Sequence, residues 1–320
     1  MTLRVRRSDR CYGRTTVSRH DDRPVLIDPR CKLTYYTYIL RGLDDLGRRY
    51  RFVRLDGPVT RYMRMRDGDR RIIVDAADDA DVDAAAYEWA DVMGKVNCTD
   101  ELLVEHPNIR MLGPLWGLQQ WPMPVAYAHA ARAAIGGANL LEAIRAIRFQ
   151  GKTRLPINAY VPATADDDYV FHRSRDWGPW HPDANQPRYR FFQALESIDV
   201  RKTASLEEGR ISLADYLAET GRSTVVFNSP AVVDCLGWKL GEYLALGKAI
   251  VSTPLGRALP EPLVHGEHIH FVDDSVDAIR DALLTVLGDR DYRMHLERGA
   301  RHWFERNLTP AIVVRRLLAE

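Results

Sequence analysis

The sequence predicts an α/β protein of two doubly wound domains that face each other across a cleft. Its 320 residues correspond to about two domains of ordinary size. Short apolar runs alternate with amphipathic stretches, which is the pattern of a parallel sheet covered by helices. The alternation stops over 151–168, where two prolines and an acidic run indicate a linker. We expect a first domain over 1–155, a second over 156–308, and a terminal helix over 309–320 that packs back on the first domain.

In the first half, apolar runs bounded by charged or turn residues predict strands over 24–28, 50–55, 71–75 and 108–112. Amphipathic stretches between them predict helices over 35–46, around Tyr87 and Trp89, and over 126–149. The first of these helices ends at Gly47, a common helix stop. The last is rich in alanine, the residue with the highest helix propensity.

The second half repeats this alternation after the linker. Strands are predicted over 169–172, 224–227, 249–252 and 268–272. Helices are predicted over 187–198, 212–219, 238–246, 276–287 and 291–306, with a last one beginning near Pro310. No internal repeat is visible, so the two halves are similar α/β layers and not a solenoid.

Composition and cysteine spacing exclude several classes of protein. With 46% hydrophobic and 28% charged residues, the chain is not disordered. Its four cysteines stand far apart and without zinc-site spacing, which favours a reducing compartment and no metal. No apolar run follows the basic N-terminus, and the longest charge-free stretch, 111–131, contains three prolines. We therefore expect a cytoplasmic protein without a signal peptide or a membrane span.

The turns after the predicted strands exclude two nucleotide-binding motifs. Neither half carries the glycine-rich fingerprint of a dinucleotide-binding fold or a Walker loop. The first predicted strand, for example, is followed by Pro29, Arg30 and Cys31. Hydride transfer and P-loop phosphoryl transfer are therefore disfavoured.

The charge of the chain is unevenly distributed. Residues 1–71 hold 19 Lys or Arg against 9 Asp and no Glu, whereas the remainder holds 26 basic and 35 acidic residues. A basic segment of this kind is typical of contact with an anionic partner, here a glycan, a small molecule, a protein or a nucleic acid. The alternative is an ordinary solvated face in an arginine-rich protein, and the sequence leaves both open.

The segment 229–272 carries the most chemical information. It follows a strand, turns through Gly237, and opens a helix with Lys239 and Glu242 that ends at Gly247. A helix N-terminus beside a glycine loop offers backbone N–H groups to a phosphate. Lys239 lies on nearly the same helical face as Glu242 and can neutralise diphosphate charge. The Glu242 carboxylate can accept hydrogen bonds from a ribose diol.

This segment resembles the donor-binding domain of GT-B glycosyltransferases. The retaining branch of that family shows two Glu separated by seven residues, a Gly three after the first, a small-residue helix and a strand. The corresponding residues here are Asp234, Gly237, Glu242, Gly247 and 248–251 (KAIV). The resemblance extends over about 224–305 and, more loosely, over 169–195. Asp234 stands in place of the usual Glu, and Ala249 in place of the usual Pro, which leaves the sugar open.

The resemblance implies a glycosyltransferase that moves a sugar from a nucleotide-diphosphate sugar to an acceptor hydroxyl, retaining and without a divalent metal or cofactor. The first domain would then lie on the acceptor side, and the second would bind the nucleotide sugar. It implies that Glu242 contacts the ribose and Asp234 the sugar. Arg173 or Arg175 would face the diphosphate together with Lys239, because stabilising the leaving group is the main catalytic demand. The implied binding site also includes three residues of the helix start and the following loop: Gly237, Trp238 and Pro254.

Other polar and aromatic residues have weaker claims. Asp28 and Asp78 follow predicted strands of the first domain and are candidate bases for an inverting enzyme, as is Asp75; helix capping is the alternative for Asp78. The acidic run 166–168 fits a solvated turn better than a metal site. Aromatic residues in two loops are either stacking platforms or loop packing: Trp116, Trp121, Trp177, Trp180 and His181.

Three other functions remain open at this point. A nucleotide-sugar epimerase or hydrolase of the same fold needs no acceptor. A sugar transferase acting on nucleic acid would explain the basic first 71 residues and would bind with steep salt dependence. A binding protein on a degenerate scaffold would bind a nucleotide sugar without turnover.

Overall fold

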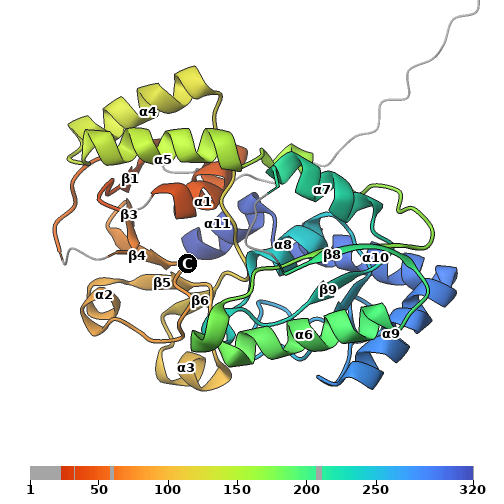
Figure 1. Ribbon diagram of the computed structural model, residues 1–320. Coiled ribbons are helices and arrows are strands. Elements are labelled where there is room, and N and C mark those ends of the chain that lie inside the picture. The colour runs from red at the N-terminus through yellow and green to blue at the C-terminus, as the bar shows by residue number, and fades with distance from the viewer. Residues whose placement is uncertain (1–22, 32, 58–60, 207–210, 320) are drawn as a thin grey trace, which may run out of the picture.

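The computed structural model describes residues 23–31, 33–57, 61–206 and 211–319. Within them the chain forms two α/β domains, joined by a linker and by the last helix (Figure 1). The predicted fold class is confirmed.

The first domain contains a six-stranded sheet in the order β2-β1-β3-β4-β5-β6. Neighbouring strands are parallel, except that β3 is antiparallel to both β1 and β4. The strands are β1 (Val25–Ile27), β2 (Tyr50–Phe52), β3 (Met63–Asp67), β4 (Arg70–Asp75), β5 (Val92–Lys95) and β6 (Ile109–Met111). The helices are α1 (Leu33–Asp45), α2 (Ala84–Trp89), α3 (Asp100–Glu105), α4 (Met123–Ile135) and α5 (Leu140–Thr153).

The hairpin of β3 and β4 is absent from the sequence prediction. In β3 the buried Met63 and Met65 alternate with Arg64 and Arg66, so no apolar run marks the strand. The turn contains Gly68 in the left-handed region (φ 61°), and Asp-Gly between alternating residues is a hairpin signal. Because arginines alternate with the methionines, the segment 63–67 does not look like a strand in the sequence despite this turn signal.

The single helix predicted over 126–149 is wrong. Gly136 and Gly137 divide it into α4 and α5, which form a helical hairpin. Gly137 has φ 108°, a backbone conformation that residues other than glycine rarely adopt. The alanine content of both halves masks this break.

The second domain contains parallel strands in the order β8-β7-β9-β10-β11, in which a single bridge between Val170 and Val225 joins the pair β7-β8 to the other three. The strands are β7 (Tyr169–Arg173), β8 (Arg201–Ser205), β9 (Val226–Asn228), β10 (Ile250–Ser252) and β11 (His270–Phe271). The helices are α6 (Pro182–Glu196), α7 (Leu213–Arg222), α8 (Trp238–Ala245), α9 (Val276–Gly288) and α10 (Arg290–Asn307). Short 3₁₀ turns are η1 (Ile157–Ala159), η2 (Gly178–Trp180) and η3 (Val232–Asp234).

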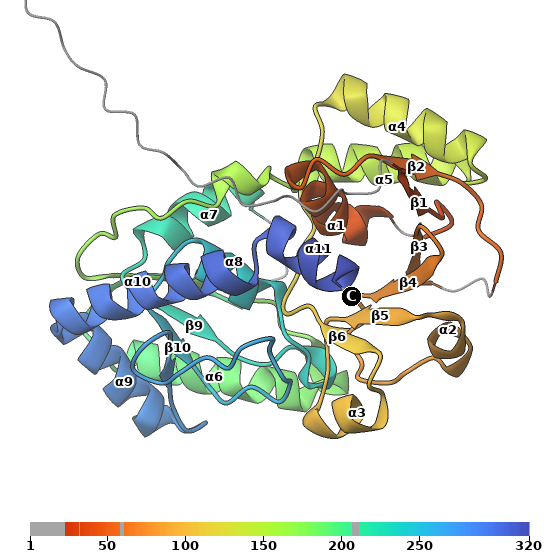
Figure 2. The same cartoon turned by 180° about the vertical axis from the view of Figure 1, so that it is seen from behind.

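The last helix, α11 (Pro310–Leu318), lies against the first domain although it follows the second (Figure 2). It packs along α1, where Gly42 leaves room for the backbone of Pro310 and the side chain of Val314. The Tyr38 hydroxyl donates to the carbonyl oxygen of Leu308 at the start of this crossing. One continuous hydrophobic core therefore includes buried residues of both domains.

Loops at the carboxyl ends of the two sheets touch each other. Asn97, after β5, accepts from the backbone N–H of Leu236 at 2.8 Å, and Ala258 N–H donates to Cys98 O at 2.8 Å. The carboxylate of Asp78, after β4, lies beside the thiol of Cys235 and raises its pKa, to which burial makes the larger contribution. The carboxyl ends of both sheets thus face one boundary, as a GT-B arrangement requires.

Candidate functional site

The carboxyl end of β7 and the N-terminus of α8 meet in the middle of the second sheet. β7 has β8 on one side and β9 on the other, so the strand order reverses here, and ligands of α/β proteins bind at such points. Lys239, in the first turn of α8, donates through Nζ to the carbonyl oxygen of Arg173, the last residue of β7. Arg173 and Lys239, which the family resemblance assigns to one site, are therefore neighbours.

Burial perturbs Lys239. Desolvation, together with the guanidinium groups of Arg188 and Arg173, lowers the pKa of its ammonium group to about 7 against the opposing effect of Glu242. Since this positive charge is poorly solvated, a phosphate group placed beside it would supply the missing counter-charge.

Arg188 is a third basic residue near the carboxyl end of β7. It is buried on α6, and its Nη1 donates to the carbonyl oxygen of Arg175 at 2.7 Å.

On β7, His172 places Nε2 at 3.0 Å from the hydroxyl of Ser174, while its buried Nδ1 has no partner among the described residues. Desolvation and the nearby Lys239 and Arg188 hold the pKa of His172 well below its usual value, so it is neutral.

Glu242 lies one turn further along α8 and is only 5% exposed. Burial raises the pKa of its carboxyl group to about 7, although Arg154, Lys239 and the nearby Tyr160 hydroxyl favour the ionised form. Arg154 and Tyr160 come from the linker, and sequence reasoning missed both because neither stands in a motif. The acid is therefore poised between its two protonation states near neutral pH.

This shift predicts a pH-dependent stability. Glu242 ionises near pH 4.5 when unfolded but near 7 when folded, so the folded state holds the extra proton between these values and loses stability as pH rises. Replacing Glu242 with Gln removes this loss. The difference in free energy of unfolding between Glu242→Gln and wild type should therefore shift in favour of the variant by about 2 kcal/mol as the pH rises from about 5 to about 7. Urea denaturation of both proteins at several pH values measures this difference; the exposed Glu196→Gln controls for loss of one carboxylate. A pH-independent difference would contradict the assigned environment.

The start of α8 is held by the linker. Gly237 is its N-cap residue and provides no side-chain cap, so the first-turn N–H groups lack that partner. Trp238 carries the guanidinium group of Arg154 over its ring at 4.4 Å from the ring centroid. Arg154 therefore contacts the helix start and the Glu242 environment at once.

Asp234 lies in a narrow crevice at the carboxyl end of β9. The crevice leaves no space for a water-sized sphere and is lined by Asn228, Ser229, Pro230, Asp234, Cys235, Leu236, Gly237, Leu240, Leu255 and Gly256. The Asp234 carboxylate covers Gly256, where a methyl group would overlap it, and lies 3.6 Å from Nη1 of Arg257. Arg257, which sequence reasoning missed, also donates through Nη2 to Val233 O at 2.6 Å.

The loop that carries Asp234 is strained. Val233 and Asp234 both adopt left-handed backbone conformations, with φ 49° and 58°. Such conformations cost about 1–3 kcal/mol each in residues other than glycine and occur where function holds them. Asp234 contacts Arg257 in the crevice, whereas Glu242 contacts the linker, so the structure separates the environments of the two carboxylates.

Asp28 does not have the environment of a base. Its carboxylate accepts from Arg30 Nη2 at 2.6 Å, from Leu55 N–H at 3.0 Å and from Arg64. Despite burial, these groups lower its pKa. Asp28 therefore ties the loops after β1 and β2 to β3, and we do not retain it as a proton acceptor.

The other predicted carboxylates fall into two kinds. Asp75 is buried in an ion pair with Lys95, with 2.6 Å between Oδ2 and Nζ. Asp78 is exposed at the boundary between the domains, next to Cys235. Of the first-domain candidates, Asp78 has the position from which an acceptor could be reached.

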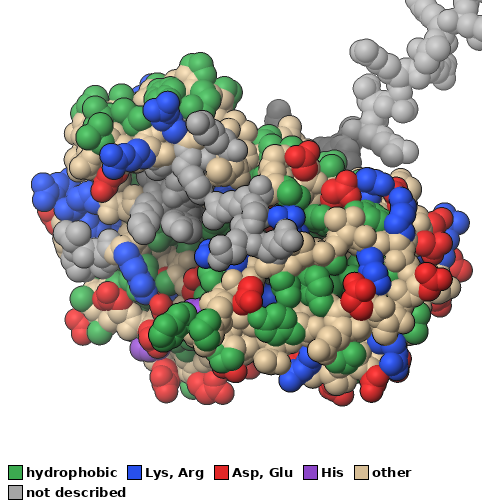
Figure 3. Space-filling model, viewed as in Figure 1, with side chains coloured by type: hydrophobic (Ala, Val, Ile, Leu, Met, Phe, Trp, Pro, Cys, Tyr) green, Lys and Arg blue, Asp and Glu red, His purple; other side chains and the backbone are tan. Residues whose placement is uncertain are grey.

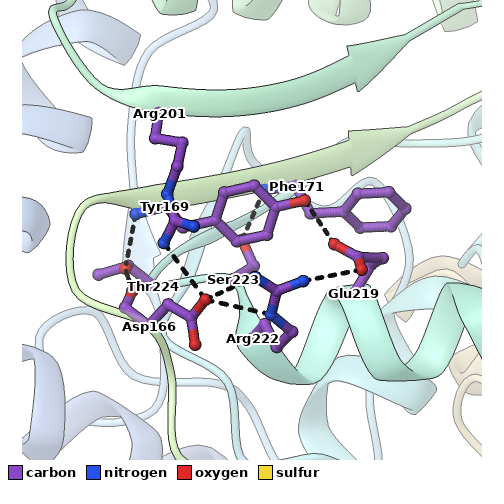
Figure 4. A network of polar contacts seen from close by, with 8 residues as sticks. All are labelled: Asp166, Tyr169, Phe171, Arg201, Glu219, Arg222, Ser223 and Thr224. Atoms are coloured by element: carbon purple, nitrogen blue, oxygen red, sulfur yellow. Dashed lines mark hydrogen bonds and ion pairs between the residues drawn. The ribbon is translucent and has the colours of Figure 1, made fainter.

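The acidic run 166–168 belongs to a structural network at the amino end of β7, away from the candidate site (Figure 4). Asp166 accepts from Arg222 Nη2 at 2.8 Å and from Arg201 Nη2 at 3.2 Å. Both guanidinium groups lie over the ring of Tyr169, whose hydroxyl donates to Glu219 at 2.5 Å. Asp167 and Asp168 lie in the exposed turn that the sequence predicts, while Asp166 joins the linker to α7 and β8.

The remaining predicted residues lie in both domains. Pro254 is exposed just after β10. Arg175 is exposed and stacks on Trp177, with 5.0 Å to the ring centroid. Trp116 is buried in the core and Trp121 stacks on His129, which favours packing for both. Of the basic segment 1–71, the part over 1–22 lies outside the described residues.

Two kinds of feature are absent from the described part of the chain. No three His, Cys, Asp or Glu side chains there are grouped as metal ligands would be. None of its helices has the length and apolar character needed to cross a membrane.

Comparison with known proteins adds structural similarity only. No family model and no curated protein matches the sequence. The C-terminal domain of the group 1 glycosyltransferase LpcC from Francisella tularensis is 14% identical with a TM-score of 0.34, over 47% of this chain and 95% of that one. A glycosyltransferase from Rickettsia africae is 11% identical with a TM-score of 0.44, over 74% and 66%. Anabaena HepE with UDP-glucose is 13% identical with a TM-score of 0.40, over 77% and 97%.

Proposed function

We propose that this chain is a GT-B glycosyltransferase that transfers a sugar from a nucleoside diphosphate sugar to an acceptor hydroxyl. The observation that carries the proposal is the meeting of Arg173, Lys239 and Arg188 at the reversal point of the second sheet, beside the N-terminus of α8. Three basic side chains beside a helix N-terminus suit a diphosphate. Glu242, one turn away, suits the ribose hydroxyls.

In the proposed reaction, the bond between the anomeric carbon and the diphosphate oxygen breaks, and its electron pair leaves with the diphosphate. The acceptor hydroxyl oxygen bonds to the anomeric carbon on the same face from which the diphosphate leaves, which gives retention of configuration, and the leaving diphosphate takes up the hydroxyl proton. Lys239 and the arginines stabilise the leaving charge without a divalent metal. Asp234 would hold the sugar.

The crevice beside Asp234 must open for this reaction. The crevice leaves no space for a water-sized sphere, whereas ordinary ligand pockets enclose ~300–1,000 Å³. The strained backbone at Val233 and Asp234 makes the loop 229–237 the segment expected to move, because the release of strain offsets the cost of breaking the hydrogen bonds that hold the loop closed.

A thermal-shift panel of UDP, GDP, ADP, CMP and dTDP and their sugars, with and without EDTA, tests the proposal. We expect one nucleotide series to raise the melting temperature in both conditions. Replacement of Lys239 by Met removes a charged hydrogen-bond donor and should weaken that nucleotide about tenfold to a hundredfold.

Lys248→Met is the matched control. Lys248 is also buried and also donates to a backbone carbonyl, that of Gly221 at 2.9 Å, but at the amino end of β10. This variant should keep the nucleotide affinity even if it is less stable. No shift from any nucleotide, equal losses in the two lysine variants, or a shift abolished by EDTA would contradict the proposal as stated.

A further inference from the structure

Arg154 in the linker has an unusual place for a charged side chain. Lys and Arg side chains stand on the surface of both domains in Figure 3, where water surrounds them. Arg154 is instead half-buried, and its guanidinium group lies over the ring of Trp238, 4.4 Å from the ring centroid. Trp238 is the first residue of α8, the helix that carries Lys239 and Glu242. The linker therefore contacts this helix where the candidate site begins.

Helix geometry brings Arg154 close to Glu242. Residues four apart on a helix lie on one face, so the ring of Trp238 and the carboxylate of Glu242 are neighbours on α8. A guanidinium group stacked on this ring consequently lies beside the carboxylate. Among the groups around Glu242, Arg154 is the one that most favours its ionised form, ahead of Lys239.

The other titratable groups around Glu242 do not replace the charge of Arg154. Burial raises the pKa of three tyrosines within electrostatic reach of the carboxylate, so all three are neutral at physiological pH. These tyrosines come from the linker, α7 and α8: Tyr160, Tyr216 and Tyr243. Lys239 carries positive charge, but the proposed function assigns that charge to the diphosphate. In the described part of the chain, Arg154 is thus the cation available to Glu242.

The backbone of Arg154 is anchored on the first domain. Arg154 directly follows α5, and the carbonyl oxygen of the next residue, Leu155, accepts from the backbone N–H of Gln119 at 3.0 Å. The side chains of Leu155 and Trp238 both pack against the core that the two domains share. These contacts fix the guanidinium group beside Glu242 before a ligand binds, and preorganised groups bind a ligand at a lower entropic cost.

The ionised form of Glu242 is the form that suits a ribose. A carboxylate accepts hydrogen bonds from both hydroxyls of the ribose diol, whereas a protonated carboxyl group carries a donor of its own. With a pKa of about 7, Glu242 is divided between the two forms near neutral pH. A cation held beside it consequently controls what fraction of the protein can recognise a ribose.

We propose that Arg154 is a positioning residue of the donor site, which keeps Glu242 as the carboxylate that recognises the ribose of the nucleoside diphosphate sugar. This inference rests on the proposed function and adds a specificity determinant from the linker to it. Recognition of the ribose should therefore depend on Arg154, whereas binding of the diphosphate should not.

Calorimetric titration with UDP, GDP, ADP and CDP, and with their 2′,3′-dideoxy forms, measures ribose recognition as the ratio of the two affinities. The proteins compared are wild type, Arg154→Met, Arg154→Lys and the control Arg71→Met, which removes a guanidinium group 5.9 Å from the ring of Trp89 in the first domain. At pH 7.5 we expect wild type and the control to prefer one ribonucleotide about tenfold over its dideoxy form. Arg154→Met should reduce this preference about threefold or more, and Arg154→Lys, which keeps the charge, should retain most of it.

The pH dependence of the same ratio separates a charge effect from a packing effect. The preference for ribose should rise as Glu242 ionises, with a midpoint near pH 7 in wild type. In Arg154→Met the midpoint should lie about one pH unit higher, because loss of a nearby positive charge raises the pKa of a carboxyl group. Deprotonation of Lys239 weakens both forms of the nucleotide equally and leaves the ratio unchanged. A side chain that only packs would lower stability or both affinities without moving the midpoint.

The outcomes distinguish this inference from the proposed function. An unchanged ratio and midpoint in Arg154→Met, or a loss in Arg154→Lys as large as in Arg154→Met, would overturn the role of Arg154. Equal binding of the ribose and dideoxy forms by wild type would also overturn it, because Glu242 would then not recognise the ribose. Binding of none of these nucleotides by wild type would overturn the proposed function, and this inference with it.

Discussion

Replacement of Lys95 by Met is expected to lower the free energy of unfolding by about 3–5 kcal/mol, because it leaves a buried carboxylate without its counter-ion. Lys95 and Asp75 are both 0% exposed, with Nζ 2.6 Å from Oδ2. They stand opposite each other on β5 and β4. Nζ also donates to the carbonyl oxygen of Asp79 at 3.0 Å, so the loop after β4 loses a hydrogen bond as well. Chemical denaturation at neutral pH measures the loss.

An exposed ion pair between β4 and the residue before β5 is the control. Arg71 and Asp91 are 2.8 Å apart but 39% and 42% exposed, so Arg71→Met should cost no more than about 1 kcal/mol. Adding Asp75→Leu to Lys95→Met removes the stranded charge and should recover much of the loss. Equal losses from Lys95→Met and Arg71→Met would show that the buried pair contributes as little as a surface pair.

Most of the second domain could be predicted because its elements follow its apolar pattern; β8 (Arg201–Ser205) was missed because its sequence, RKTAS, contains no apolar run. The strand 249–252 and the helix 238–246 coincide with β10 and α8 to within about two residues, since both are buried and bounded by glycine. The family resemblance assigned Arg173 and Lys239 to one site, and the structure brings these two residues together. The cationic part of the site was therefore within reach of the sequence.

The missing parts depend on contacts between distant residues. β3 escaped prediction because Arg64 occupies a buried position, and nothing local shows that Asp28 will pair with it 36 residues away. The same ion pair between Asp28 and Arg64 makes Asp28 a structural residue and not a candidate base. Likewise, the neighbourhood of Glu242 depends on Arg154 and Tyr160, whose place beside α8 is set by the path of the linker.

The docking of α11 provides the second large expected effect. Gly42→Ala should destabilise the protein by about 3 kcal/mol or more, the upper range for overpacking, because a methyl group there would overlap the carbonyl oxygen of Pro310 and the Cγ2 of Val314. A backbone carbonyl cannot rotate away as a side chain can, so α11 must shift from α1. Since α11 links the second domain to the first, the shift also loosens the boundary at which the candidate site lies. Thermal denaturation of the variant measures the loss of stability.

Gly288→Ala is the matched control, because this glycine also lies in a helix but has no heavy atom within 4 Å of the added methyl group in the described part of the chain. Alanine has a helix propensity about 1 kcal/mol more favourable than glycine, so Gly288→Ala should be neutral or stabilising. The same propensity gain acts at Gly42, and a net loss there consequently measures steric overlap with α11. A variant of Gly42 as stable as wild type would mean that α11 is free to move, and then the two domains are held together by their loop contacts and not by the returning helix.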